Sequence, residues 1–517
     1  MSTGPAPGVG GRGALAAAWL LGVLWEGVPL IPALLRGELP GGRYTDLYPS
    51  VWGLGWFMAH QPGLPTWIDR LAAPDGMPFY FSAPLHGWPG WPFAVLIGDP
   101  LRGAVVAYVA TLILARGATV LVSFYALRAL GYAGGGALAG ALVYGASPYF
   151  HGFSAEGIIE GTDGWALALW VWMVARERRL AAVGAFALCV VSSWYLGMVA
   201  CALALAWGWW RRVAWASLVG GLVLASPFVW AFLHAAPGAA PLPDDVRIAM
   251  GAPLAIRAPW WRADTGFALN TWIGLSIPVL ALLSVRRHPG PGALALVCFL
   301  LSTGWGPWYD LPVFASVRFP YRWHAGTLAC LAPLVAATVE RSGRSWLALL
   351  PFVEAALLSP IPLVLPGAPT DVPAIYTQVR GPILLDVPGP VALPPGEINL
   401  SRPRARYLLY AQLQHGAASP WVSDFNGIAA SPSASWLEAV AAYDRVWRGA
   451  HPDAPVHPPI DLVAARAAGV TQVMVHLDEL GAEGGAFVAA LKAAGAHPEA
   501  EEGRLALFRL EDSDGPR

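Results

Sequence analysis

The sequence predicts a polytopic α-helical membrane protein, with about eleven transmembrane helices and a small α/β domain in its C-terminal part. Of its 517 residues, 56% are hydrophobic and only 13% are charged, against roughly 25% charged in ordinary soluble proteins. Hydrophobic runs follow one another up to about residue 365, and the sequence then becomes mixed in polarity. A formal net charge of −1 provides no basic field for nucleic acid, so a nucleic-acid-binding protein is excluded.

A helix that crosses a bilayer needs roughly 20 apolar residues. Apolar runs near that length predict transmembrane segments at 13–35, 105–130, 137–150, 162–174, 180–193, 195–210, 213–233, 270–285, 292–305, 323–339 and 346–365. Several are short, which leaves tilted, re-entrant or fused helices open. The first run lacks a clear small-residue cleavage site and is longer than a signal-peptide core, so we expect an uncleaved helix.

Arginine residues set the expected orientation. They gather in short connections on one side of the predicted helices: Arg176, Arg178, Arg179, Arg211, Arg212, Arg286, Arg287, Arg341 and Arg344. The positive-inside rule makes this side cytoplasmic, so we expect a protein of the cytoplasmic (inner) membrane with its N-terminus in the cytoplasm. The large loop 36–101 and everything after residue 366 are then expected outside the cytoplasm.

The C-terminal residues 366–517 are expected to form an extracytoplasmic α/β domain after a transmembrane domain of residues 1–365. Strands are predicted at 383–387, 407–412, 470–476 and 504–510. Helices are predicted from the capping box at Ser435 and Glu438 to about Trp447, and at 460–468 and 485–494. Gly469 and Gly495 are predicted to end the last two helices. This alternation is typical of a small α/β domain.

Aromatic residues are frequent in the first outer loop. Trp52 and Trp56 are four residues apart, which places them on one face of a short helix expected at 51–60. We expect this helix to lie in the membrane interface, as part of an aromatic belt at the level of the headgroups. The alternative is a platform that also shapes a substrate groove.

Asp46 lies between Tyr44 and Tyr48 in this loop and is the candidate catalytic base. Partial desolvation at an interface raises the pKa of a carboxylate toward a range useful for proton abstraction. The alternative is a structural role, in which Asp46 caps the interfacial helix or pairs with Arg43.

A second acidic group consists of Glu156, Glu160 and Asp163. Their spacing of i, i+4 and i+7 places them on one face of a helix. Like charges so close are unfavourable unless a cation or protons offset them. We therefore expect them to bind a divalent cation such as Mg²⁺ or Mn²⁺, or the hydroxyls of a sugar, with His151 as a neighbour. Solvated loop residues are the alternative.

Arg318 and Arg322 flank the sequence Phe-Pro-Tyr before a late hydrophobic run. A guanidinium group matches the geometry of a phosphate, so both are candidates to bind the phosphate of a lipid substrate. Nonspecific anchoring to headgroups is the alternative.

Other polar groups fall inside the hydrophobic runs. Charged residues there usually have a partner or face a cavity, and we favour structural pairing for Glu26, Arg116 and Glu354. The cysteines show no metal-ligand spacing and are expected to serve core packing: Cys189, Cys201, Cys298 and Cys330.

Short motifs in a fixed order relate these segments to a known superfamily. They are PLHGWP at 84–89, FYALR at 124–128, SPYFHG at 147–152, Gly-Trp at 164–165 and VRFPYR at 317–322. With an acidic residue in the first outer loop, this order resembles the GT-C superfamily of membrane glycosyltransferases. Within it, the sequence is most similar to the YfhO-like branch and to relatives of protein mannosyltransferases. The resemblance covers roughly residues 13–366.

The resemblance implies a hexosyltransferase that moves a sugar from a polyprenyl-phosphate-linked donor to a lipid, glycan or protein acceptor on the outer face of the membrane. Many members carry adjacent Asp-Glu in the first outer loop, whereas Leu47 follows Asp46 here. Two other classes of function are left open by the sequence: a lipid or polysaccharide transporter, and a non-catalytic envelope assembly protein.

Overall fold

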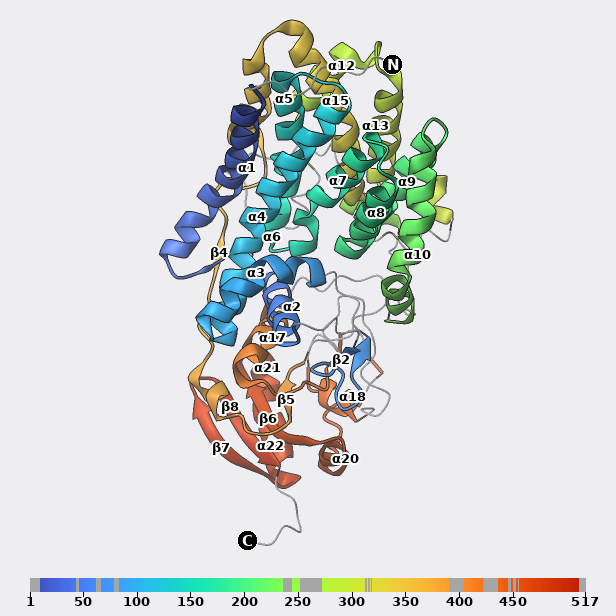
Figure 1. Cartoon of the computed structure of the whole chain (residues 1–517). Helices are drawn as coiled ribbons and strands as arrows, with labels where there is room; N and C mark the ends of the chain where they lie inside the picture. The colour runs from blue at the N-terminus through green and yellow to red at the C-terminus, as the bar shows by residue number, and fades with distance from the viewer. Residues whose placement is uncertain are drawn as a thin grey trace.

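A computed structural model describes residues 10–42, 46–61, 67–78, 83–235, 244–251, 272–311, 314, 317, 319–389, 403–421, 436–444, 448–449, 452–453 and 455–510. Helices gather into a bundle at one end of the molecule, and a four-stranded sheet with short helices lies at the other end (Figure 1). We refer to the end of the bundle nearest the sheet as the domain end.

The bundle contains the hydrophobic segments. It is built from α1 (Gly10–Leu35), α3 (Ala83–Ile97), α4 (Pro100–Ala129), α5 (Gly134–Gly145), α6 (Pro148–Glu156), α7 (Gly164–Ala175), α8 (Arg179–Ser192), α9 (Trp194–Gly208), α10 (Arg212–Ala235), α12 (Ser276–Val285), α13 (Pro289–Ser302), α15 (His324–Ser342) and α16 (Leu350–Leu358). Each of the eleven predicted segments overlaps a helix of this bundle, although α16 ends at Leu358 and the segment 137–150 is broken between α5 and α6. Among the described helices, three are long and apolar enough to cross a bilayer, namely those at Gly13–Leu35, Pro100–Ala129 and Arg212–Trp230. The helical membrane architecture is confirmed, and the number of spans stays a prediction.

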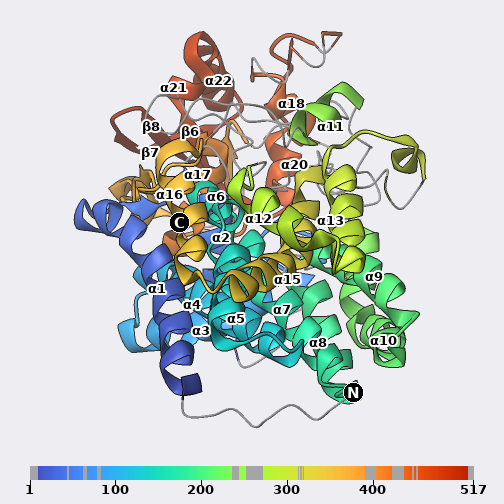
Figure 2. The same cartoon turned by 90° about the horizontal axis from the view of Figure 1, so that it is seen from above.

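Helix α4 packs against α1, α3, α5 and α7. Seen from above, α1, α3, α4 and α5 form one side of the bundle, whereas α8, α9 and α10 form the other (Figure 2). Small residues permit the close approach of α1 to α4, because a Cβ atom added to Gly22 would lie 2.9 Å from the main-chain oxygen of Arg116. Such contacts are typical of helix packing in membranes.

Helix α3 was not predicted, because Pro89 and Pro92 made its sequence look like part of the outer loop. It forms nevertheless because it packs against α4. A Cβ atom on Gly90 would lie 2.4 Å from the Cβ atom of Ala107, so a glycine is needed at this contact. The segment 36–101 is therefore not a continuous loop.

The charges predicted to pair inside the bundle do so. Arg116 and Glu26 are fully buried, and Arg116 Nε donates to Glu26 Oε2 at 2.9 Å. Two further hydrogen bonds run from Arg116 to the main-chain oxygens of Gly145 (3.1 Å) and Phe150 (2.8 Å). Arg116 thereby links the end of α5 to the first turn of α6. Elsewhere in the bundle, Glu354 accepts a hydrogen bond from the main-chain nitrogen of Ser276 at 2.7 Å.

The sheet has the strand order β5-β6-β8-β7. Its strands are β5 (Ile383–Val387), β6 (Val470–His476), β7 (Ala496–Glu502) and β8 (Leu505–Leu510). Strands β5 and β6 are parallel, and the other pairs are antiparallel. Short helices accompany them: α18 (Leu437–Ala441), α20 (Leu462–Ala467), α21 (Leu477–Leu480) and α22 (Gly484–Ala493). Leu385, Val473 and Phe487 are fully buried in the core of this part.

Several predictions for the C-terminal part need correction. Residues 407–412 do not form a strand, because they belong to the helix α17 (Pro403–His415). A short apolar run does not distinguish a helix from a strand, and here packing against the bundle decides. Strand β7 was missed because its sequence is polar and it lies at the sheet edge. Helix α18 ends at Ala441, earlier than predicted, while Ser435 and Trp447 lie outside the described residues.

Other C-terminal predictions are confirmed. Strands β5 and β6 have the predicted bounds, and β8 begins one residue later than predicted. Gly469 (φ +85°) and Gly495 (φ +93°) follow the ends of α20 and α22 in the left-handed conformation. Glycine adopts this conformation without steric cost, which is why it ends helices so often.

Helix α2 (Leu47–Ala59) joins the bundle to the C-terminal part. Its tryptophans Trp52 and Trp56 are only 2% and 3% exposed, so the prediction that they belong to an interfacial aromatic belt is wrong. They pack against α17, and Trp52 Nε1 donates to Gln412 Oε1 at 2.6 Å.

The short strands β1 (Leu39–Pro40) and β4 (Gly367–Ala368) pair across the predicted boundary between residues 365 and 366. That boundary stays a prediction. The short strands β2 (Trp67–Ile68) and β3 (Met77–Pro78) pair with each other, and a further helix, α11, spans Asp244–Gly251.

The contact of α17 with the 3-10 turn at Ala374–Gln378 predicts a pH dependence of stability. His415 stacks on Tyr376, with ring centroids 5.5 Å apart. Burial lowers the pKa of His415 to about 4, although the charge of Asp386 opposes this shift. Between an unfolded pKa near 6.5 and the folded value, the unfolded chain binds more protons, so the free energy of unfolding falls with decreasing pH by at most about 1.4 kcal/mol per unit.

We expect His415→Phe to flatten this acid dependence, because phenylalanine keeps the ring contact and does not titrate. The measurement is thermal unfolding of the full chain in detergent between pH 7 and 4, followed by tryptophan fluorescence. Equal slopes for the wild type and the variant would show that other groups cause the dependence.

Candidate functional site

Asp46 lies at the domain end of the bundle, where the start of α2 meets the end of α6. The main-chain nitrogen of Gly42 donates to the oxygen of Ala155 at 2.7 Å, and Ser50 Oγ donates to the oxygen of Gly157 at 2.8 Å. These bonds, one on each side of Asp46 in the sequence, dock its loop onto α6. The side chain of Asp46 makes no capping hydrogen bond to α2 and is partly exposed. Arg43 and Tyr44 lie outside the described residues.

Gly157 makes the contact between these two helices possible. It ends α6 in the left-handed conformation, with a φ of +72°. A Cβ atom at this position would lie 2.6 Å from the Cα and Cβ atoms of Leu47. Because α6 ends here with Glu156, which is 3% exposed, the start of α2 and this buried carboxylate belong to the same junction.

The predicted helix that presents Glu156, Glu160 and Asp163 on one face does not form. Gly157 ends α6 directly after Glu156, and a 3-10 turn at Ile159–Thr162 follows. The carboxylates of Glu160 and Asp163 therefore turn to different partners. Within the described part of the chain, no group of three or more His, Cys, Asp or Glu side chains is placed to hold a metal ion. The three carboxylates do not fit a shared cation site.

Asp163 is engaged on two sides. His86 Nε2 forms an ion pair with its carboxylate, and Trp165 Nε1 donates to Asp163 Oδ1 at 2.9 Å. Both His86 and Asp163 are buried, with 1% exposure each. The motif at 84–89 served only for the family resemblance, and no role was predicted for His86 from the sequence. A histidine within an apolar motif does indicate that its side chain has a polar partner.

Arg322 forms an ion pair with Glu160 and is only 5% exposed. Its guanidinium group also faces the rings of Tyr195, at 4.4 Å from the centroid, and Phe319, at 5.2 Å. Such cation–π contacts hold the side chain in place. The Nε atom is buried and has no hydrogen-bond partner among the described residues, so Arg322 retains a donor. Arg318 lies outside the described residues.

His151 does not join the acidic group. Its ring lies in the bundle, where Nδ1 is 3.7 Å from Glu26 Oε2 and Nε2 is 2.9 Å from the main-chain oxygen of Pro362. His151 therefore binds α6 to α1 and to the chain after α16. The expectation that it neighbours Glu160 and Asp163 is wrong, because both of these residues follow the end of α6 and pair with Arg322 and His86, whereas His151 contacts Glu26 and Pro362.

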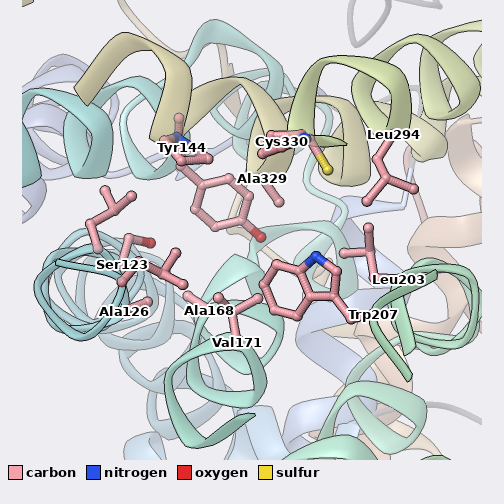
Figure 3. Close-up of a pocket in the computed structure, with 15 residues that line it drawn as sticks. Ser123, Ala126, Tyr144, Ala168, Val171, Leu203, Trp207, Leu294, Ala329 and Cys330 are labelled. Atoms are coloured by element: carbon pink, nitrogen blue, oxygen red, sulfur yellow. The ribbon is translucent and has the colours of Figure 1, made fainter. Parts of the chain in front are cut away.

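An apolar pocket of about 50 Å³ lies inside the bundle (Figure 3). Tyr144 of α5 and Trp207 of α9 point into it, between Ser123 of α4 and Cys330 of α15 (Figure 3). The pocket is distant from Asp46. Helix α4 begins near α2, which follows Asp46, whereas Ser123 lies in the last third of α4. Cys189, Cys298 and Cys330 are buried free thiols, as predicted.

This architecture is the fold of the GT-C membrane glycosyltransferases, as the sequence resemblance predicted. The chain is similar to the arabinofuranosyltransferase AftD from Mycobacteria, with a TM-score of 0.64 and 16% identity over 98% of this chain and 40% of that one. It is also similar to the archaeal oligosaccharyltransferase AglB from Archaeoglobus fulgidus in complex with an inhibitory peptide and a dolichol-phosphate. Here the TM-score is 0.52, with 11% identity over 98% of this chain and 75% of that one.

These likenesses concern the fold. The chain spans less than half the length of AftD. No protein-family model matches the sequence, and no curated protein does.

Proposed function

We propose that the chain is a membrane glycosyltransferase that moves a sugar from a polyprenyl-phosphate-linked donor to an acceptor at the extracytoplasmic face. The observation that carries this proposal is the junction of α2 and α6, which holds Asp46 beside a buried carboxylate at the domain end of a GT-C fold. The dolichol-phosphate bound in the AglB structure supports a lipid-phosphate donor.

In this reaction Asp46 accepts the proton of the acceptor hydroxyl. The acceptor oxygen then bonds to the anomeric carbon of the sugar, and the bond from that carbon to the phosphate oxygen breaks. The phosphate leaves with the electron pair, and its negative charge is stabilised by Arg322, with Arg318 as the second candidate. Glu156 is assigned to hydroxyls of the acceptor or the sugar. No step is assigned to a divalent cation.

The remaining predicted residues act as positioning groups in this proposal. Glu160 orients Arg322 through their ion pair. Asp163 holds α3 through His86, and His151 holds α6 through the main chain at Pro362. Fixed geometry is a large part of catalysis when two substrates must meet.

The proposal is tested by incubating the purified chain in proteoliposomes with a labelled polyprenyl-phosphate sugar and membrane extract as acceptor. We expect the label to appear in a covalent product. Movement of the labelled lipid or glycan across the membrane without such a product would favour the transporter. The absence of both, together with loss of envelope integrity on deletion of the gene, would favour the assembly protein.

Arg322→Lys is expected to raise the KM for the donor about tenfold or more, with a smaller effect on kcat. Lysine keeps the positive charge and loses the planar donor fork, and hydrogen bonds to charged groups contribute about 1.5–3 kcal/mol. The measurement is initial rate against donor concentration. Arg178→Lys, an exposed position between α7 and α8 at the far end of the bundle, is the matched control. An unchanged KM for Arg322→Lys would exclude this residue from donor binding.

A further inference from the structure

A groove of about 720 Å³ lies where the junction of α3 and α4 meets the segment 370–372 and α17. Its size is that of a binding site for a small molecule. It is separate from the apolar pocket inside the bundle and contains none of the residues assigned to the reaction above. The segment after β4 runs past this side of the bundle toward the sheet (Figure 1).

The apolar part of the groove lining continues onto exposed residues of α3. Ile97 and Val106 line the groove and are 39% and 37% exposed. The neighbouring Val95 and Leu96 of α3 are exposed to 62% and 83%. Exposed apolar side chains in a membrane helix bundle face lipid. An alkyl or isoprenoid chain placed along these apolar residues therefore passes directly from the groove into the bilayer.

The polar part of the lining carries more negative than positive charge. It includes Asp99, Asp371, Arg102 and Gln414. Two carboxylates and one guanidinium disfavour an anionic headgroup such as a lone phosphate. They suit a group rich in hydroxyls, because carboxylates accept hydrogen bonds from hydroxyls and a guanidinium donates to their oxygens. This combination matches a sugar headgroup.

The groove is also close to the helix that begins after Asp46. Tyr410 lines the groove, and its ring lies 5.2 Å from that of Tyr48 in the first turn of α2. Tyr48 in turn donates a hydrogen bond to the oxygen of Pro369 at 3.0 Å, just before the segment that lines the groove. One layer of tyrosine rings therefore separates the groove from the start of α2.

We propose that this groove binds a glycolipid, with its uncharged sugar at Asp99, Arg102 and Asp371 and its hydrocarbon chain along α3 and α4. This inference rests on the proposed function, in which the glycolipid is the acceptor. The chemical class of the acceptor is then a lipid-linked glycan, held in the membrane beside α2.

The test is binding, measured without turnover. The probe is dodecyl maltoside with a photoreactive diazirine in its alkyl chain, applied to the full chain in nanodiscs and located by mass spectrometry. We expect labelled peptides from residues 97–106 and 370–372. Val106→Trp fills the groove from an exposed position and is expected to reduce this labelling at least about tenfold. Leu205→Trp, at an exposed position of α9, is the control for the added ring.

Two polar variants test the sugar site. Asp371→Asn and Asp99→Asn are each expected to weaken binding of the probe about tenfold, since each removes charge-assisted hydrogen bonds. Asparagine is as good a helix cap as aspartate, so Asp99→Asn preserves the start of α4. Equal affinity of the wild type and both variants would overturn the sugar assignment.

Competition experiments distinguish the sources of the ligand. Unlabelled dodecyl maltoside is expected to displace the probe, whereas phosphatidylglycerol and free maltose at equal concentration are not. Displacement by phosphatidylglycerol would show a phospholipid site, and displacement by free maltose would show a site for soluble glycans. Either result overturns the proposal. Labelling of the groove by a chain that shows no transfer would contradict the proposed function and leave the glycolipid site in place.

Discussion

Asp46→Asn is expected to lower kcat for sugar transfer by a factor of about 10²–10⁴, the usual contribution of a general base. Asparagine has nearly the same size as aspartate, but it does not accept the proton. The start of α2 and its docking to α6 depend on main-chain atoms and on Ser50, so they are preserved. The loss therefore reports the chemical step.

The measurement is single-turnover transfer from the labelled donor, together with thermal unfolding of each variant. The melting temperature of Asp46→Asn is expected to stay close to that of the wild type. Asp453→Asn, which alters an exposed carboxylate of the C-terminal part, controls for the loss of one negative charge. Wild-type turnover of Asp46→Asn would rule out this residue as the base.

Arg116→Met is expected to destabilise the fold by about 3–5 kcal/mol, the cost of removing one partner of a buried ion pair. The variant leaves the Glu26 carboxylate without its fully buried cation. It also removes the donors for the main-chain oxygens of Gly145 and Phe150 at the break between α5 and α6. Because α6 carries Glu156 and docks the loop of Asp46, we expect transfer to fall together with stability.

A double variant separates charge from packing. Glu26→Leu combined with Arg116→Met replaces the pair by apolar side chains and is expected to recover most of the lost stability, as such replacements often do. Arg128→Met, at the exposed end of the same helix, is the control and is expected to change stability by less than about 1 kcal/mol. The measurement is thermal unfolding in detergent. A single variant as stable as the wild type would show that the ion pair of Arg116 and Glu26 does not stabilise the fold.

Much of the fold was predictable from the sequence because it depends on local patterns. Long apolar runs such as Pro100–Ala129 form helices wherever the solvent is lipid, since the main chain has no other hydrogen-bond partners there. The buried strand Val470–His476 is apolar over most of its length, and Gly469 and Gly495 mark helix ends for steric reasons. These features need no knowledge of distant residues.

The arrangement of the candidate site was not predictable in the same way. Glu160 and Arg322 are 162 positions apart, and Trp52 and Gln412 are 360 positions apart. The spacing of Glu156, Glu160 and Asp163 predicted one helical face, but Gly157 ends α6 in the left-handed conformation, where Leu47 of α2 packs against it. Glu160 then pairs with Arg322 and Asp163 pairs with His86, because the fold brings these partners near them.

Composition and periodicity by themselves determined that this is a helical membrane protein with a mixed strand and helix region after it. The reason is that the preference of a segment for helix, strand or membrane depends mainly on residues close to it in the sequence. Tertiary packing alone decided that residues 407–412 are helical, that α3 forms despite its prolines, and which charged groups meet. The physical reason is that a buried charge or a short apolar run is stabilised by whatever lies against it, and only the folded chain supplies that neighbour.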